Sequence, residues 1–276
     1  MRLYMLHHHC IWTSRIPRVC YFIEPAVNGS VGILKSAVKN SASLKRIVIV
    51  ASTACIYRDT NEPLVLSEND WNDQAIHDVA RLGRNASFWT KYNASKTLAE
   101  KAAWTFYRQH QEDVNWDLVV TNPSYVFGPS LNPVSSLSQI NASSKLWYEA
   151  VVDPNGYSAH ISEPSKSWVD VRDLAQVLVK SLVCPEAGGE RIIITSGSAV
   201  WQDWLDTANA LSPSPIPSHS PNTDKVLPRG SLGGGKNAVH KIKYDTSKAQ
   251  RLFQPVYRTM EETTRDTLAD FEKRGW

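Results

Sequence analysis

Tyr92 and Lys96 are the two residues whose types and spacing most clearly suggest chemistry. Four residues apart on a helix, their side chains lie on one face, one turn from each other. An ammonium group beside a phenol favours the phenolate, so it lowers the tyrosine pKa from about 10. The pair therefore predicts a proton donor or acceptor at a carbonyl or alcohol. A Tyr-x-x-x-Lys pair alone is weak evidence, because it occurs by chance in many proteins.

A serine follows a run of β-branched residues, Arg46–Ala51, which predicts a strand buried on both faces of a parallel sheet. Ligands of open α/β sheets bind at the carboxyl ends of the strands. Ser52 can therefore donate to the same carbonyl oxygen that Tyr92 protonates. Ser52 alone could equally cap a strand end, and Lys96 alone could be a solvated helix lysine. Together, and in this order, the three residues favour hydride transfer from a nicotinamide.

A second strand end supports the same chemistry. Leu118–Val120 is predicted as a buried strand, and the segment Asn122–Pro129 follows it. Pro123 lacks an amide donor and restrains the chain. Neighbouring backbone groups are then expected to face a ligand, such as the carboxamide of a nicotinamide.

The remaining elements predict an α/β fold, because buried strands alternate with helices. We expect a partial nucleotide-binding domain over residues 1–155 and a smaller, partly interwoven substrate lobe over 156–276. Residues 59–85 are polar, and residues 212–235 indicate a long surface loop. Helices are expected from Pro25, over Ser95–His110, 143–152, Asp173–Leu182, Trp201–Leu211, Thr246–Phe253 and Met260–Arg274, and strands over Leu3–Leu6, Trp168–Val171 and Arg191–Thr195.

Composition excludes several classes of protein. A net charge of +3 over 276 residues, without a basic run, does not suggest nucleic-acid binding. No apolar run is long enough to span a membrane, and the start is a poor signal peptide, so we expect a cytoplasmic protein. The four widely spaced cysteines indicate reduced thiols. His7–Cys10 is not expected to bind a metal, because consecutive strand residues point to opposite faces.

Seven collinear segments carry a resemblance to a known family: Glu24–Leu34, Arg46–Ala54, Ser67–Asp73, Tyr92–Trp104, Asn122–Leu131, Trp168–Ala175 and Tyr244–Phe253. The chain resembles the extended short-chain dehydrogenase/reductases of the NAD(P)-dependent epimerase/dehydratase superfamily. Within them it is most similar to the group of dihydroflavonol reductases, yeast-type methylglyoxal and carbonyl reductases, and cinnamoyl-CoA reductases.

The resemblance implies an NAD(P)-dependent reductase of aldehydes or ketones, with NADP(H) favoured over NAD(H). Ser52 would bind the carbonyl, Tyr92 would be the general acid, and Lys96 would lower its pKa and bind the cofactor with it. Val50–Ser52 stands where the family usually has Thr-Ser-Ser, so Thr53 is the alternative to Ser52. The cofactor segment would be Pro123, Ser124, Tyr125 and Val126. The expected partner is a small carbonyl substrate, and the expected state is a monomer or homodimer.

The family's glycine-rich phosphate-binding turn is missing. Gly230–Gly235 is the main glycine cluster, but it follows a Pro-rich loop and does not open a helix after a strand. We therefore expect a Rossmann-like, doubly wound parallel sheet that lacks its first βαβαβ portion, truncated before Leu3–His7. Two alternatives remain open: a non-catalytic relic, and an epimerase, dehydratase or 3β-hydroxysteroid-dehydrogenase-like member. Several aromatic residues could line a substrate pocket: Trp71, Trp89, Tyr125, Trp147 and Tyr157.

Overall fold

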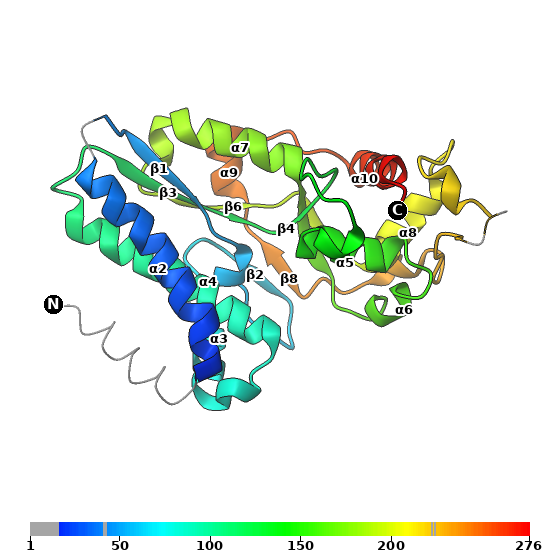
Figure 1. Cartoon of the computed structure of the whole chain (residues 1–276), viewed down its shortest axis with the longest axis horizontal. Coiled ribbons are helices and arrows are strands. Elements are labelled where there is room, and N and C mark those ends of the chain that lie inside the picture. Colours follow the sequence, from blue (N-terminus) through cyan, green and yellow to red (C-terminus); the bar gives the residue numbers. More distant parts are fainter. Residues whose placement is uncertain (1–16, 41–42, 222, 224) are drawn as a thin grey trace. The chain divides into compact units, whose positions relative to one another are not determined.

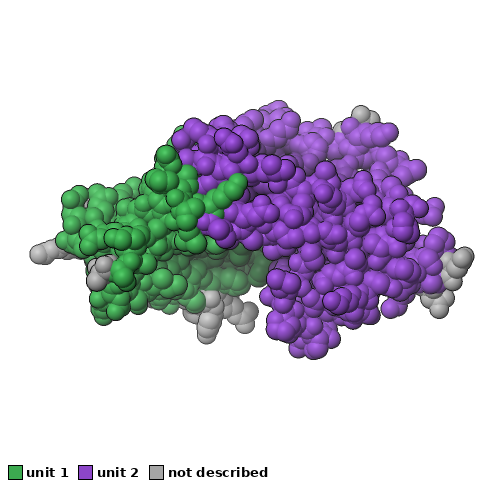
Figure 2. Space-filling model, turned by 90° about the horizontal axis from the view of Figure 1, so that it is seen from above, with its two compact units in different colours: residues 1–59, 66–122, 180–193 green, residues 60–65, 123–179, 194–276 purple. Residues whose placement is uncertain are grey.

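The computed structural model describes residues 17–40, 43–221, 223 and 225–276 (Figure 1). The predicted strand Leu3–Leu6 and the segment His7–Cys10 lie outside these residues. The chain forms two compact units (Figure 2): unit 1 holds Met1–Asp59, Leu66–Asn122 and Lys180–Ile193, and unit 2 holds Thr60–Val65, Pro123–Val179 and Ile194–Trp276. The predicted boundary at residue 155 thus falls inside unit 2, and the chain enters each unit more than once.

Unit 1 is built on a sheet with the strand order β1-β3-β6. The strands are β1 (Arg46–Val50), β3 (Asp117–Pro123) and β6 (Arg191–Ile194). β1 and β3 are parallel, with Arg46 opposite Asp117 and Val50 opposite Thr121. β3 is buried beyond its first residue, but β1 is partly exposed, and Val50 is 46% exposed. Burial on both faces was therefore a wrong prediction for β1, because β1 is an edge strand among the described residues.

Three helices complete unit 1: α2 (Pro17–Lys39), α3 (Asp73–Leu82) and α4 (Phe88–His110). α2 lies along α4 (Figure 1), and Ile23 and Val27 share a buried cluster with apolar residues of α4. The helix predicted from Pro25 begins at Pro17, so Pro25 lies in its interior. An interior proline removes one backbone hydrogen bond, and the packing of Ile23 and Val27 stabilises the helix on both sides of it.

α3 occupies part of the polar stretch that was not assigned an element. It begins at Asn72, whose side-chain oxygen accepts a 3.0 Å hydrogen bond from the Ala75 amide. α4 begins earlier than predicted, after Ser87, whose hydroxyl accepts from the Thr90 amide at 3.0 Å. As a result, the whole Tyr92–Lys96 segment is helical. No helix in the described part of the chain is long and apolar enough to cross a membrane.

Unit 2 contains two small sheets. One has the order β4-β5-β7, with β4 parallel to β5 and β5 antiparallel to β7, and the other pairs β2 with β8. The strands are β2 (Leu64–Leu66), β4 (Tyr125–Phe127), β5 (Lys166–Asp170), β7 (Gly197–Ala199) and β8 (Ile242–Tyr244). The helices are α5 (Ala142–Val151), α6 (Tyr157–His160), α7 (Val171–Val183, which continues into unit 1), α8 (Trp201–Ala210), α9 (Ser247–Phe253) and α10 (Met260–Arg274).

Aromatic side chains form the core of unit 2. The Trp204 ring lies 4.9 Å from Trp168, 5.5 Å from Phe127 and 5.9 Å from Trp147, measured between ring centroids. Trp147, which was expected to line a pocket, is fully buried in this core. Its role is packing, the more common role of a large aromatic side chain.

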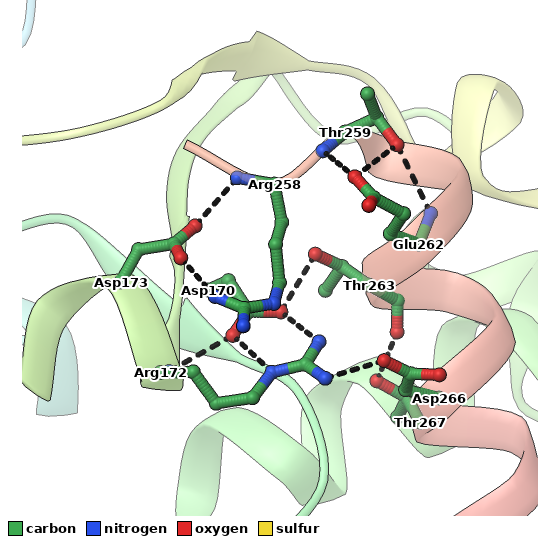
Figure 3. Close-up of polar contacts among 9 residues, drawn as sticks. All are labelled: Asp170, Arg172, Asp173, Arg258, Thr259, Glu262, Thr263, Asp266 and Thr267. Carbon is green, nitrogen blue, oxygen red and sulfur yellow. Dashed lines mark hydrogen bonds and ion pairs between the residues drawn. The ribbon is translucent and has the colours of Figure 1, made fainter. Parts of the chain in front are cut away.

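A buried carboxylate ties the corner between β5 and α7 to α10 (Figure 3). Asp170 is fully buried and accepts hydrogen bonds from the Arg172 amide and guanidinium at 2.7–2.9 Å and from the Thr263 hydroxyl at 2.8 Å. Burial acts to raise the pKa of Asp170, but these bonds outweigh it and lower the pKa below the ordinary value. Gly128, at φ +122°, packs here, because a Cβ would lie 3.3 Å from an Asp170 oxygen.

Candidate active site

Ser52 lies directly after β1 and begins a short 3-10 turn, η1 (Thr53–Cys55). Its backbone is extended, and its Oγ accepts a 3.1 Å hydrogen bond from the Ala54 amide. A hydroxyl that accepts through one lone pair still has its proton to donate. Thr53, the alternative to Ser52, is 8% exposed. Ser52 is the more accessible of the two hydroxyls.

Tyr92 and Lys96 occupy the first half of α4, which packs against η1. Both side chains are half-buried. Among the residues that the structure describes, Lys96 forms no hydrogen bond or ion pair. A half-buried ammonium group without a partner in the described part of the chain suits a ligand that carries hydroxyl or phosphate oxygens.

The pKa of Tyr92 is raised from its ordinary value, not lowered as the spacing to Lys96 predicts. Burial of the phenol is the largest cause, since it disfavours the charged form. A hydrogen bond with the Ser52 side chain acts in the opposite direction, and the nearby Cys55 adds to the increase. The prediction considered only the neighbour one helical turn away, and in this structure burial dominates. Because α4 packs against η1, Tyr92 and Ser52 stand on neighbouring elements.

A buried polar cluster lies under this site and was not predicted. It consists of Cys55, Glu100, Asn122 and Arg191, and we call it the Glu100 cluster. Glu100 Oε1 accepts from Arg191 Nε at 2.6 Å, and Oε2 accepts from Asn122 Nδ2 at 2.8 Å. Cys55 is fully buried, and burial, with the nearby Glu100 carboxylate as a further cause, raises the pKa of its thiol well above the ordinary value. Glu100 follows Lys96 by one helical turn, which is the local signal that could have suggested it.

The segment Ser67–Asp73 holds the arginine of the Glu100 cluster. Arg191 Nη1 donates to the carbonyls of Glu68 and Asp70, and its guanidinium lies 3.6 Å from the centroid of the Trp71 ring. Stacking on an aromatic ring and bonds to carbonyls compensate a buried guanidinium for lost water. Trp71, another expected pocket residue, therefore supports Arg191.

The predicted nicotinamide segment begins where β3 ends. Pro123 and Ser124 are buried, and Tyr125 and Val126 are half-buried in β4. The Ser124 amide donates to the Ile194 carbonyl at 3.1 Å, so this donor is not available to a ligand. The assignment of these four residues to the cofactor stays a prediction.

The glycine cluster in unit 2 does not fit a phosphate. The Gly233 amide donates to Asp206 at 2.8 Å, and a Cβ on Gly235 would lie 2.0 Å from an Asp203 oxygen. Carboxylates at this position would repel an anion. The described residues therefore fit the nicotinamide and ribose end of a dinucleotide, at Tyr92 and Lys96, and contain no glycine-rich turn that opens a helix after a strand. Within the same ranges, no three His, Cys, Asp or Glu side chains gather as metal ligands do.

Comparison with known proteins identifies the family of this chain. Residues 10–195 match the NAD dependent epimerase/dehydratase family, and the chain belongs to that family. It is 30% identical over 262 residues to the NADPH-dependent methylglyoxal reductase GRE2 of Saccharomyces cerevisiae, covering 90% of this chain and 70% of that protein. It is 28% identical to the ketoreductase azaE of Aspergillus niger over 90% of this chain and 68% of that one.

Solved structures give the same result. The crystal structure of yeast methylglyoxal/isovaleraldehyde reductase Gre2 complexed with NADPH superposes with a TM-score of 0.73 at 28% identity, over 91% of this chain and 72% of that chain. The predicted family, reductase group and Rossmann-like α/β fold are confirmed. The prediction of an oxidoreductase of the NADP(H)-using group is confirmed as well.

Proposed function

We propose that this chain reduces an aldehyde or ketone with NADPH, with Ser52, Tyr92 and Lys96 as its catalytic residues. The observation that carries the proposal is the packing of α4, which bears Tyr92 and Lys96, against η1, the turn that Ser52 begins at the carboxyl end of β1. Lys96, without a protein partner among the described residues, follows one turn along α4. The relatives named as methylglyoxal reductase and ketoreductase support the same substrate class.

The roles follow from the chemistry of each group. NADPH, when bound, supplies the hydride that reaches the carbonyl carbon. Ser52 donates a hydrogen bond to the carbonyl oxygen, since its hydroxyl proton stays available while Oγ accepts from the Ala54 amide. Tyr92 gives its proton to the same oxygen, and the product is an alcohol. Its raised pKa keeps the phenol protonated at neutral pH, as an acid requires.

Lys96 has two roles in this proposal. Its ammonium would hold the ribose hydroxyls of the cofactor, and its charge would stabilise the phenolate that Tyr92 becomes after proton transfer. Tyr92 would contribute to the same end of the cofactor. Solvent then returns the proton to the phenolate.

The first test is a titration of the purified chain with NADPH, in which nicotinamide fluorescence reports binding. Methylglyoxal is then added, and the loss of NADPH absorbance reports turnover. We expect binding and turnover, with the Tyr92→Phe variant as the inactive control. If no binding occurs at millimolar NADPH, the proposal fails and the non-catalytic alternative gains support.

A further inference from the structure

The turn that carries Ser52 is held from below by a single side chain. Asn122 is fully buried, and its Nδ2 donates both to the Ser52 carbonyl, at 3.1 Å, and to Glu100, at 2.8 Å. Both partners are acceptors, so the amide group can only face them with its NH2. The orientation of Asn122 is thereby determined by its contacts.

The anchor of Asn122 is itself rigid. Glu100 is 2% exposed, and its carboxylate also accepts from Arg191 Nε and from Trp104 Nε1. A buried carboxylate with three such donors has little freedom to move. A continuous path of hydrogen bonds therefore runs from Arg191 through Glu100 and Asn122 to the Ser52 carbonyl.

That carbonyl controls where the Ser52 hydroxyl lies. It also accepts from the Cys55 amide at 3.0 Å, the bond that closes η1. The Ala54 amide of the same turn donates to Ser52 Oγ. If the carbonyl shifts, the turn shifts with it, and so does the Ser52 hydroxyl, on the turn against which α4 packs.

We propose that Asn122 and Glu100 are positioning residues, which hold the Ser52 hydroxyl toward Tyr92 through the Ser52 backbone carbonyl. This inference rests on the proposed function, since it assigns support to the serine and tyrosine of that site. Neither residue touches the reacting atoms. Their effect is on the position of the Ser52 hydroxyl relative to the Tyr92 hydroxyl.

The first measurement is the pKa of Tyr92, monitored by NMR. The tyrosine rings are labelled with ¹³C, and the Tyr92 signal is the one that disappears in Tyr92→Phe. In Asn122→Ala we expect this pKa to rise further by about 0.5 to 1, the value of one hydrogen bond of ordinary strength. Lys96 and Cys55, the charged or titratable groups beside it, are unchanged in this variant. Asp117→Asn, a change at the other end of β3, should leave the Tyr92 pKa where it is.

The second measurement is turnover at saturating NADPH and methylglyoxal. We expect kcat to fall about 10- to 100-fold in Asn122→Ala, with little change in KM, because a misplaced hydroxyl weakens the transition state more than substrate binding. Glu100→Gln should cause a smaller loss of the same kind. Asp117→Asn should retain normal turnover.

A double variant separates positioning from stability. Asn122→Asp alone places a carboxylate against Glu100 and should destabilise the fold. In Asn122→Asp with Glu100→Gln, the repulsion is gone and thermal stability should recover, but residue 122 no longer donates to the Ser52 carbonyl. The Tyr92 pKa should therefore stay displaced. Recovery of the wild-type pKa in this double variant would overturn the inference.

The outcomes distinguish the two proposals. A wild-type chain without NADPH turnover, in which Asn122→Ala still displaces the Tyr92 pKa, refutes the proposed function and supports the positioning role. An active wild-type chain in which Asn122→Ala and Asp117→Asn both keep the normal Tyr92 pKa and kcat supports the function and refutes the positioning role.

Discussion

Unit 1 contains two arginine–carboxylate pairs of the same length in different surroundings. Arg191 and Glu100 are joined at 2.6 Å, and so are Arg46 and Asp117 at the start of β1 and β3. The two arginine side chains are similarly buried, at 10% and 9% exposure, but Glu100 is fully buried and the Asp117 side chain is 35% exposed. Glu100 reaches Ser52 through Asn122, whereas Arg46 donates to the carbonyls of Ser181 and Cys184.

The length of an ion pair therefore does not reveal its role. The Arg46 pair joins the starts of two strands to the end of α7 and the residues that follow it, which is a structural task. The Arg191 pair is connected, through Asn122, to the turn that carries Ser52. The two pairs differ in their further partners: Glu100 also binds Asn122, whereas Arg46 also binds the carbonyls of Ser181 and Cys184.

The largest effect on turnover is expected at Tyr92, and the effect of Glu100 is compared with it. Tyr92→Phe should reduce turnover by about 10²- to 10⁴-fold, because the general acid is lost. Adding Glu100→Gln to Tyr92→Phe should cause little further loss, since Glu100 acts through the hydrogen bond that Tyr92 no longer makes. Steady-state kinetics of the two single variants and the double variant check this. Fully additive losses would mean that Glu100 acts independently of Tyr92.

Stability should separate the two pairs next. Arg191→Met leaves Glu100 buried and unpaired, which should lower the free energy of unfolding by about 3–5 kcal/mol. Arg46→Met should cost only about 1 kcal/mol, because water reaches Asp117. Urea unfolding followed by far-UV circular dichroism measures both changes. Equal losses would remove the distinction drawn from the exposure of the two carboxylates.

Lys96 provides a third contrast, between two lysines of α4. Lys96→Ala should weaken NADPH binding by about 10- to 100-fold, the worth of charge-assisted hydrogen bonds, and should lower turnover as well. Lys101 forms an ion pair with Asp73 and lies 5.1 Å from the centroid of the Trp71 ring, so Lys101→Ala is the matched control with little effect on binding. Fluorescence titration of both variants decides whether the unpartnered lysine is the functional one.

The smallest expected effect concerns acid stability in unit 2. The pKa of Asp170 is lowered in the folded chain, so its contribution is present above the unfolded pKa of about 3.9 and is lost as pH falls through the folded value. Asp170→Asn should therefore lower stability by about 1–3 kcal/mol at neutral pH, and by progressively less in acid. Calorimetry of Asp170→Asn at neutral and at acidic pH tests the sign of this change in stability. Asp266→Asn, which alters a more exposed carboxylate, is the control. If the stability difference between the wild type and Asp170→Asn grew in acid, the lowered pKa of Asp170 would be contradicted.

Local patterns predicted much of this molecule. The spacing of Tyr92 and Lys96, the strand before Ser52 and the helix Met260–Arg274 were all visible in the sequence. The last of these has a clear signal, since Thr259 and Glu262 form a capping box. Each of these features depends on residues within a few positions of one another.

The missed features depend on residues far apart in the chain. Arg191 lies 91 positions from Glu100, and no local pattern shows that a helical glutamate is buried instead of solvated. The same reason explains the Tyr92 pKa, because the sequence gives the neighbouring lysine but not the burial of the phenol. Residues 59–85 concealed β2 and α3, since polar residues that cap a helix or bind an arginine resemble a surface loop.

The tryptophan core of unit 2 has a spectroscopic consequence. Trp147, Trp168, Trp201 and Trp204 are all at most 5% exposed, and their rings lie close enough to exchange excitation energy. Their emission should therefore be blue-shifted and collective in the folded chain. In unit 1, by contrast, the Trp71 ring contacts a guanidinium. The intrinsic fluorescence should thus include a blue-shifted contribution from unit 2, while Trp71→Phe difference spectra report on the surroundings of Arg191.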